Sequence, residues 1–311
     1  MRKRSFLRLT ALAALVLVAG ALYIFGYDLG IVSPSGRLSN LKLSALKPEE
    51  NGFSAIEMTP DGLGFAALGD RGTFFSGRLF RLDNGVLIGW TIDYAGRLRN
   101  SNGRFPPVSG PDAEGLTMGY RDGFAISSEK NRDIMYFSDP QASAENLPAP
   151  PDSKDLPPNQ KYESLALDVT GRLYTMPEHS RFLDRDFPLW RLDPGADYWV
   201  EDRRISLEAG YRPVGADFGP DGFFYLLERS LRVGVGNRVR RFDLSDPLET
   251  GQVVWVKRGL RRSNFEGLSV WERQGCIVLT MISDNNFSAL MESRILEIVP
   301  GSTSGDPTVC G

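Results

Sequence analysis

Residues 266–285 read EGLSVWERQGCIVLTMISDN and contain most of what identifies the fold. A short apolar segment begins at Glu266–Leu268, a turn follows at Arg273–Gly275, and a second apolar segment ends at Asp284. The same plan occurs four more times upstream, at intervals of roughly 50 residues, which is the signature of a ring or solenoid of structural repeats.

Two positions mark each repeat. The first lies at the start of the unit and is occupied in turn by Ser54, Glu114, Glu163, Val214 and Glu266. The second follows the second apolar segment and is assigned to Asp70, Glu129, Glu178, Glu228 and Asp284. Because acidic residues recur at fixed places in the repeat, the pattern concerns chemistry as well as fold.

The turn between the two positions usually carries glycine. Pro60–Gly62 and Pro220–Gly222 both contain Asp-Gly between apolar runs, a strong signal for a β-hairpin. Each unit holds three to four strands, with no helical periodicity past residue 30. We therefore predict an all-β protein, a β-propeller of five readable repeats with five or six blades. A sixth blade has three candidate sources: Val86–Tyr94, Val253–Lys257, or the N-terminal segment joined to the C-terminus.

The amino-acid composition excludes several classes of function. The 36 basic and 39 acidic residues give a net charge of −3, which argues against a nucleic-acid-binding protein. His179 is the only histidine, so multi-histidine metal sites are excluded and His179 is the only histidine that could act as a base. A structural role beside Glu178 is the alternative for His179. No Gly-x-Ser-x-Gly motif supports a serine-hydrolase mechanism.

The N-terminus resembles an export or anchoring signal. Arg2, Lys3, Arg4 and Arg8 precede the uncharged apolar run Leu9–Phe25. Cleavage after a small-x-small site at Ala19–Ala21 predicts a signal peptide, whereas the continued apolar run predicts a retained single-span anchor. Either outcome places the domain outside the cytoplasm, in the periplasm. The predicted organisation is residues 1–29 as signal or anchor, 30–48 as linker with one strand at Leu38–Leu46, 49–300 as propeller and 301–311 as tail.

Three further features are structural predictions. Cys276 and Cys310 form a candidate disulfide in an oxidising compartment, unless Cys276 is simply a core residue. Asn100–Pro111 and Gln141–Gln160 are rich in proline and polar residues, and we interpret both as long loops.

In a propeller the innermost strands surround a central channel, so a residue repeated once per blade forms a ring. Crowded carboxylates raise one another's pKa unless a cation neutralises them. Ca²⁺ accepts six to eight oxygen ligands from carboxylates and amides, which fits this set. We predict that Glu114, Glu163 and Glu266 are both catalytic and metal-binding residues, with Asp70, Asp284 and Asn285 as further ligands.

The competing interpretation is architectural. Arg71, Lys130 and Arg229 directly follow acidic residues of the second set, which also fits a ring of salt bridges between blades. In the catalytic interpretation these three side chains bind an anionic substrate. Arg261 and Arg262, in the basic segment Lys257–Arg262, join them unless that segment is a solvated loop.

Taken in order, five motifs resemble the phytase-like family, also called "esterase-like activity of phytase". They lie at Asp70–Gly72, Asp112–Leu116, Glu163–Ala166, Glu266–Ser269 and Ser283–Phe287. The resemblance covers about residues 45–300 and implies a bacterial, mostly exported propeller that hydrolyses phosphoesters or esters, with Ca²⁺ as a plausible cofactor.

The predicted function is therefore Ca²⁺-dependent hydrolysis of a small phosphorylated or ester substrate. The alternative is a membrane-tethered propeller with a structural Ca²⁺ ion and no catalytic turnover, serving as a binding or envelope scaffold. The sequence makes no prediction of the oligomeric state.

Overall fold

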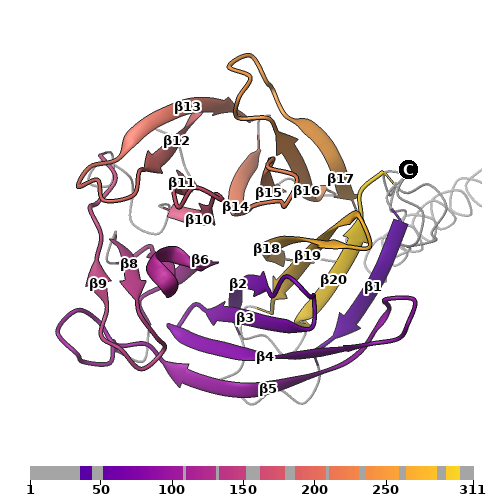
Figure 1. Cartoon of the computed structure of the whole chain (residues 1–311), viewed down its shortest axis with the longest axis horizontal. Coiled ribbons are helices and arrows are strands. Elements are labelled where there is room, and N and C mark those ends of the chain that lie inside the picture. The colour runs from indigo at the N-terminus through magenta and orange to yellow at the C-terminus, as the bar shows by residue number, and fades with distance from the viewer. Residues whose placement is uncertain are drawn as a thin grey trace, which may run out of the picture.

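Antiparallel β-strands form nearly all of the regular structure of the described residues. The computed structural model describes residues 36–43, 52–107, 110–130, 133–151, 162–178, 186–207, 210–230, 235–258, 264–285 and 292–301. Within these ranges the strands form five sheets of four strands each, arranged around a common centre (Figure 1). The fold is a five-bladed β-propeller. The one helical element described is a 3₁₀ turn, η2 (Tyr120–Asp122).

The five sheets are numbered as blades in chain order. Blade 1 contains β2 (Phe53–Met58), β3 (Gly64–Gly69), β4 (Thr73–Arg81) and β5 (Leu87–Arg97). Blade 2 contains β6 (Ala113–Met118), β7 (Phe124–Ser128), β8 (Asp133–Phe137) and β9 (Glu145–Asn146). Blade 3 contains β10 (Tyr162–Leu167), β11 (Leu173–Pro177), β12 (Asp186–Leu192) and β13 (Val200–Ser206). Blade 4 contains β14 (Tyr211–Phe218), β15 (Phe224–Ser230), β16 (Val235–Phe242) and β17 (Gln252–Arg258). Blade 5 contains β18 (Asn264–Arg273), β19 (Cys276–Asp284), β20 (Arg294–Val299) and β1 (Gly36–Lys42).

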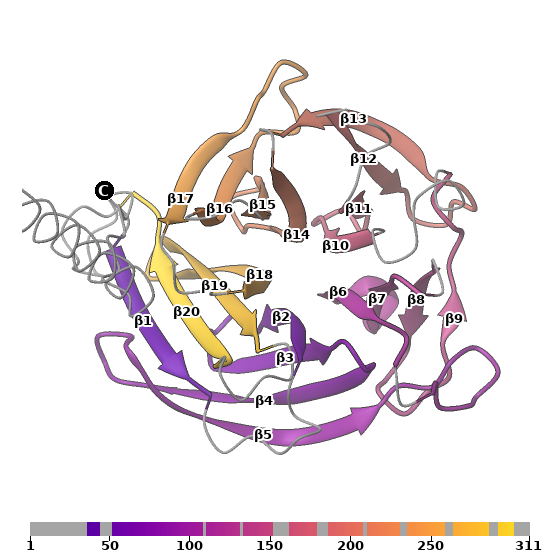
Figure 2. The same ribbon diagram turned by 180° about the vertical axis from the view of Figure 1, so that it is seen from behind.

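The ring closes with a strand from the beginning of the chain. β1 pairs antiparallel with β20 and becomes the outer strand of blade 5, as Figure 2 shows from behind. A buried ion pair supports the same seam: Arg81 of blade 1 binds both carboxylate oxygens of Glu297 in blade 5, at 2.6 and 2.7 Å. Closure therefore joins the two ends of the propeller through backbone and side-chain contacts.

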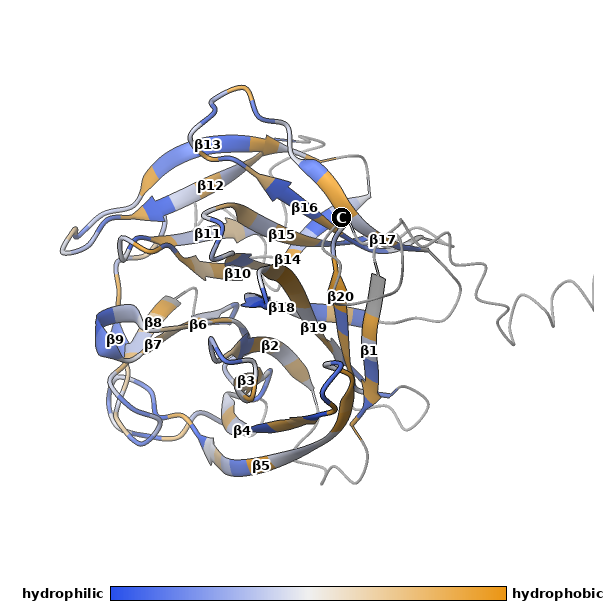
Figure 3. Cartoon of the chain, turned by 45° about the vertical axis from the view of Figure 1, so that its right-hand side comes forward, coloured by the Kyte–Doolittle hydropathy of each residue, from blue (hydrophilic) through white to orange (hydrophobic). Residues whose placement is uncertain are grey.

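The hydrophobic core consists of layers between adjacent blades rather than one central cluster. Blades 1 and 2, for example, share Leu68, Phe74, Phe124 and Ile126, and the Phe74 and Phe124 rings lie 4.7 Å apart. Burying a side chain of this size contributes roughly 1.5–3 kcal/mol. In Figure 3 hydrophobic residues predominate in β19 and β20, whereas the outer strand β13 is mostly hydrophilic.

The structure corrects several sequence-based expectations. Val86–Tyr94 and Val253–Lys257 do not form a sixth blade, because they belong to the outer strands β5 and β17 of existing blades. The strand expected at Leu38–Leu46 is β1, which ends at Lys42 and belongs to the propeller rather than to a linker. The predicted loop Gln141–Gln160 contains the short strand β9, and its last nine residues lie outside the described ranges.

Other sequence-based predictions concern residues that lie wholly or partly outside the described ranges. The segment 1–29, Cys310 and most of the predicted tail belong to this group, so the disulfide stays a prediction; Cys276 itself is buried in β19. None of the helices in the described ranges is long and hydrophobic enough to span a membrane.

Candidate functional site

Every blade has the same irregularity in its innermost hairpin. The pairing register shifts between the first two strands at Ser54, at Glu114 together with Gly115, and at Glu163, Val214 and Glu266. A β-bulge of this kind leaves a residue unpaired and redirects its side chain. These five bulged positions line one narrow cavity at the centre of the ring. The five residues at the first repeated position therefore form a ring around this cavity, because each blade carries the same bulge.

In three blades a glycine follows the bulge and packs against the inner strand of the neighbouring blade. A Cβ atom at Gly267 would lie 2.7 Å from the backbone nitrogen of Ile56, and one at Gly215 would lie 2.4 Å from the carbonyl oxygen of Glu266. Both distances are too short for any side chain. The Glu-Gly-Leu motif therefore combines a ring carboxylate with the close strand packing that narrows the channel.

The bulge also fixes the second ring. In each hairpin, the residue before the bulge pairs with a residue on the second strand, and the next residue along that strand is the second position. The pairs Phe53–Gly69, Ala113–Ser128, Tyr162–Pro177, Pro213–Glu228 and Phe265–Ser283 define it. The second ring therefore consists of Asp70, Glu129, Glu178, Arg229 and Asp284.

The assignment of Glu228 to this ring was wrong by one residue. Glu228 is fully buried within blade 4, where it binds Arg238 and accepts a 2.8 Å hydrogen bond from Nε of Arg240. Arg229 occupies the ring position instead.

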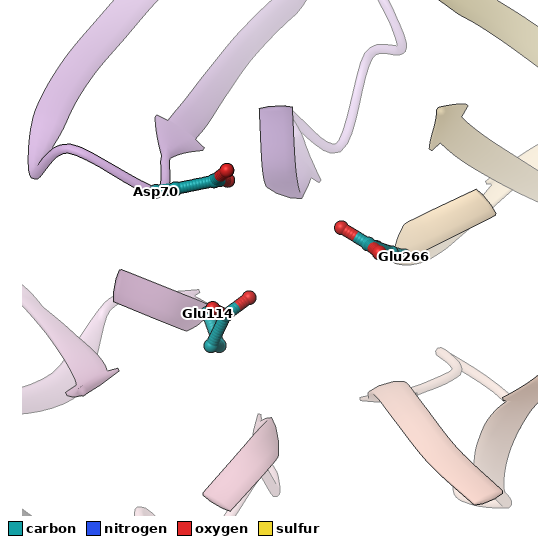
Figure 4. A group of neighbouring side chains, drawn as sticks. All are labelled: Asp70, Glu114 and Glu266. Carbon is teal, nitrogen blue, oxygen red and sulfur yellow. The ribbon is translucent and has the colours of Figure 1, made fainter. Parts of the chain in front are cut away.

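The acidic side chains form two groups. Carboxylate oxygens of Asp70, Glu114 and Glu266 lie within 4.8 Å of one another, and Figure 4 shows them pointing toward a common point from the β3–β4 turn, β6 and β18. We call these three residues the first acidic group. Glu129, Glu163 and Glu178 also lie within 4.8 Å of one another and form the second acidic group. The predicted trio is thus divided: Glu114 and Glu266 lie in the first group and Glu163 in the second.

Burial and mutual repulsion shift the titration of these groups. Burial, with the nearby Asp284 and Glu266, raises the pKa of Asp70 to about 8. Burial also raises the pKa of Glu266 to about 7, despite the opposing effect of Arg229. The pKa of Glu114 is well above its usual value because of burial and then Glu163 and Asp70. Burial and Glu178 raise the pKa of Glu163 in the same way. The carboxyl groups therefore cannot all ionise at neutral pH without an added cation.

Two arginines supply part of the positive charge needed to balance these carboxylates. Arg229 donates to Glu266, to Oδ1 of Asn264 at 2.7 Å and to Oε1 of Glu178 at 3.4 Å. Arg212 lies 3.3 Å from the same oxygen of Glu178. Asn264 also donates to Glu266 at 2.6 Å and to Asp284 at 3.5 Å.

Sequence reasoning missed Arg212 and Asn264. Both lie two positions before a ring residue, Val214 or Glu266, and Asp112 has the same relation to Glu114. Comparing that register position across the repeats would have identified them.

The first acidic group fits a hard divalent cation. Oδ1 of Asp70 is buried and, among the described residues, has no hydrogen-bond partner. The neighbouring atoms that could bind a metal ion are carboxylate oxygens. Asn285 follows Asp284 in the sequence, and its amide oxygen lies 3.4 Å from the backbone nitrogen of Gly52. Oxygen-only donors with a negative charge suit Ca²⁺.

The remaining predicted site residues are placed as follows. Arg71 and Lys130 are exposed, and Lys130 lies 3.8 Å from Asp112. Arg261, Arg262 and His179 lie outside the described residues.

A separate pair of acids lies three residues further along the inner strands. Glu57 and Asp217 are both buried, and the hydroxyl of Ser269 lies between them, 3.3 Å from Glu57 and 3.5 Å from Asp217. Burial and Asp217 raise the pKa of Glu57 well above its usual value. Burial raises the pKa of Asp217 to about 7, although hydrogen bonds from Val270 and Phe218 oppose the shift. This pair joins blades 1, 4 and 5.

We expect Glu57→Gln to flatten the dependence of stability on pH. Because the folded state holds these protons more tightly than the unfolded chain does, stability falls as pH rises from the ordinary carboxyl range through about 7. The variant should raise the melting temperature at pH 8, by about 2–4 °C for each kcal/mol of relieved repulsion. Melting curves from pH 5 to 9 test this, with the exposed Glu272→Gln as control. Equal slopes for variant and wild type would contradict it.

The chain aligns with several solved structures at low sequence identity. No curated protein matches the chain significantly. A Dyadobacter fermentans protein of unknown function aligns at 10% identity and a TM-score of 0.46, covering 79% of this chain and 75% of that one. The Dos1 propeller aligns at 11% identity and a TM-score of 0.38, covering 75% of this chain and 53% of that one. A protein described as a "putative gluconolactonase" aligns at 13% identity and a TM-score of 0.40, covering 84% of this chain and 95% of that one.

A protein-family model matches most of the sequence. A family model described as "Phytase-like: Esterase-like activity of phytase" matches residues 49–287. That range includes both acidic groups and all five bulged positions of the channel. The chain therefore belongs to the phytase-like family.

Proposed function

We propose that the protein is a Ca²⁺-dependent hydrolase of phosphoester or carboxylic ester bonds that acts at the central channel. One observation carries the proposal. Among the described residues, seven carboxyl groups (Asp70, Glu114, Glu129, Glu163, Glu178, Glu266 and Asp284) surround the channel, and the guanidinium groups of Arg212 and Arg229 contact two of them, Glu178 and Glu266. Such an excess of buried negative charge favours a bound divalent cation.

The residues that would hold the ion are Asp70, Glu114 and Glu266, with Asp284 and Asn285 beside them. When bound, Ca²⁺ would supply Lewis-acid polarisation of a phosphoryl or carbonyl oxygen. Exposed Arg71 and Lys130 are the side chains that would bind an anionic substrate.

Glu163 is the residue we assign to proton transfer. It lies outside the first acidic group, and burial together with Glu178 raises its pKa, which makes its carboxylate a stronger base. In the proposed reaction Glu163 accepts a proton from the attacking water and returns it to the leaving group. General base catalysis of this kind contributes about 10²–10⁴-fold in rate.

The proposed location is outside the cytoplasm, with the N-terminal segment as signal or anchor. The support is the cationic start followed by the apolar run Leu9–Phe25. N-terminal sequencing of the protein from cell-envelope and soluble fractions tests this. A start after Ala21 indicates cleavage, an intact N-terminus in the membrane fraction indicates an anchor, and an intact cytoplasmic protein contradicts export.

The experiment for the reaction is hydrolysis of a generic phosphomonoester and a generic acyl ester by the full chain. We expect turnover of one of them with Ca²⁺, loss of turnover with a chelator, and recovery when Ca²⁺ is restored. Turnover that is insensitive to the chelator would contradict the Ca²⁺ requirement.

One observation favours a second candidate, the non-catalytic scaffold. Arg229 links Glu178 of blade 3 to Glu266 of blade 5, so part of the ring is an interblade ion-pair network. If Ca²⁺ raises the melting temperature but neither substrate is hydrolysed, the scaffold with a structural ion is the better account.

A further inference from the structure

Arg229 breaks the pattern of the second ring. The same register position holds an acid in the other four blades: Asp70, Glu129, Glu178 and Asp284. Blade 4 also lacks an acid in the first ring, where Val214 occupies the bulge. Blade 4 thus contributes a cation to a channel to which every other blade contributes carboxylates.

The contacts of Arg229 reach both acidic groups. One guanidinium nitrogen binds Glu266 of the first group and Asn264, and another lies 3.4 Å from Glu178 of the second group. The guanidinium group of an arginine stays charged at any pH at which the protein is folded. Arg229 is therefore a permanent cation inside the ring.

Within the described ranges, the cations that contact the two acidic groups are distributed unevenly. In the second group, Arg229 and Arg212 both contact Oε1 of Glu178. In the first group, Arg229 contacts Glu266 alone, and Oδ1 of Asp70 has no hydrogen-bond partner among the described residues. Repulsion in the first group is thus the less compensated of the two.

We propose that Arg229 is a positioning residue that takes the place of a second divalent ion. It neutralises the second acidic group and directs a single Ca²⁺ ion to the first group. The inference rests on the Ca²⁺ site of the proposed function. It adds that the number and the location of bound ions are set by one side chain of blade 4.

The test is the number of Ca²⁺ ions bound per chain, measured by equilibrium dialysis of the metal-depleted full chain. We expect one ion for the wild type and two for Arg229→Met, which keeps the side-chain length but removes the charge. Arg229→Lys should restore one ion. Arg212→Met is the matched control, because Arg212 contacts Glu178 but not the first group, and it should also bind one. A single ion in Arg229→Met, or two in Arg212→Met, would overturn the inference.

A second variant covers the case in which Arg229→Met does not fold. Glu178→Gln should bind the same number of ions as the wild type, because Arg229 rather than a metal neutralises Glu178. Loss of the ion in Glu178→Gln would contradict the inference. If the wild type and Arg229→Met each bind one ion, the inference fails and the Ca²⁺ requirement of the proposed function stands. If neither binds Ca²⁺, both fail.

Discussion

Replacement of Glu114 by glutamine is expected to reduce Ca²⁺-dependent turnover by about 10²-fold or more, the scale for loss of one essential charged group in an active site. Glu114 belongs to the first acidic group and interacts electrostatically with Glu163, Asp70, Glu266 and Glu129. Glutamine keeps the shape and one oxygen but removes the negative charge that would hold the ion. Initial rates at saturating Ca²⁺ measure the effect.

The same variant should be more stable than the wild type when no metal is present. In the folded protein the pKa of Glu114 is raised, so folding without metal is penalised as the pH rises above the ordinary carboxyl range. Glutamine removes that penalty. The matched control is Glu201→Gln, an exposed residue paired with Arg204 on β13, which should change neither rate nor stability appreciably. Undiminished Ca²⁺-dependent turnover in Glu114→Gln would rule out the first acidic group as the site.

Replacement of Glu228 by alanine is expected to lower the free energy of unfolding by about 3–5 kcal/mol, the cost of removing one partner from a buried ion pair. Glu228 is fully buried and is the shared partner of Arg238 and Arg240, whose side chains are also almost completely buried. Without it, two buried guanidinium groups lose the carboxylate that they share.

Urea denaturation of Glu228→Ala gives the free energy directly. Glu201→Ala removes an exposed ion pair with Arg204, and it should cost no more than about 1 kcal/mol. A change of that small size in Glu228→Ala would contradict the structural role of Glu228. The number of Ca²⁺ ions bound by folded Glu228→Ala should equal that of the wild type, because Glu228 lies outside the second ring.

The propeller was predictable because its repeat is local. The hairpin turns, the Glu-Gly-Leu motif at Glu266–Leu268 and the acids after the second strands are all visible in one sequence. The number of blades was less accessible, because β5 and β17 resemble additional strands and ring closure by β1 depends on pairing with β20 across the whole chain.

The site was predictable in composition but not in arrangement. Leu227-Glu228-Arg229 matches the other repeats if acids are aligned with acids, and only the bulge at Val214 shows that Arg229 holds the ring position. The division of Glu114, Glu163 and Glu266 between two groups depends on how inner strands from different blades converge. The register position of Arg212 and Asn264 could be compared across the repeats, but their partners in neighbouring blades could not be predicted from it.

We expect the first acidic group to bind a divalent cation. Isothermal titration calorimetry of Ca²⁺ into the metal-depleted full chain tests it most directly, with Glu114→Gln measured in parallel. We expect saturable binding of one ion to the wild type, accompanied by a higher melting temperature, and loss of that binding in Glu114→Gln. Absence of binding to the wild type at millimolar Ca²⁺, with an unchanged melting temperature, would exclude this cation site and leave the channel acids as an interblade ion-pair network.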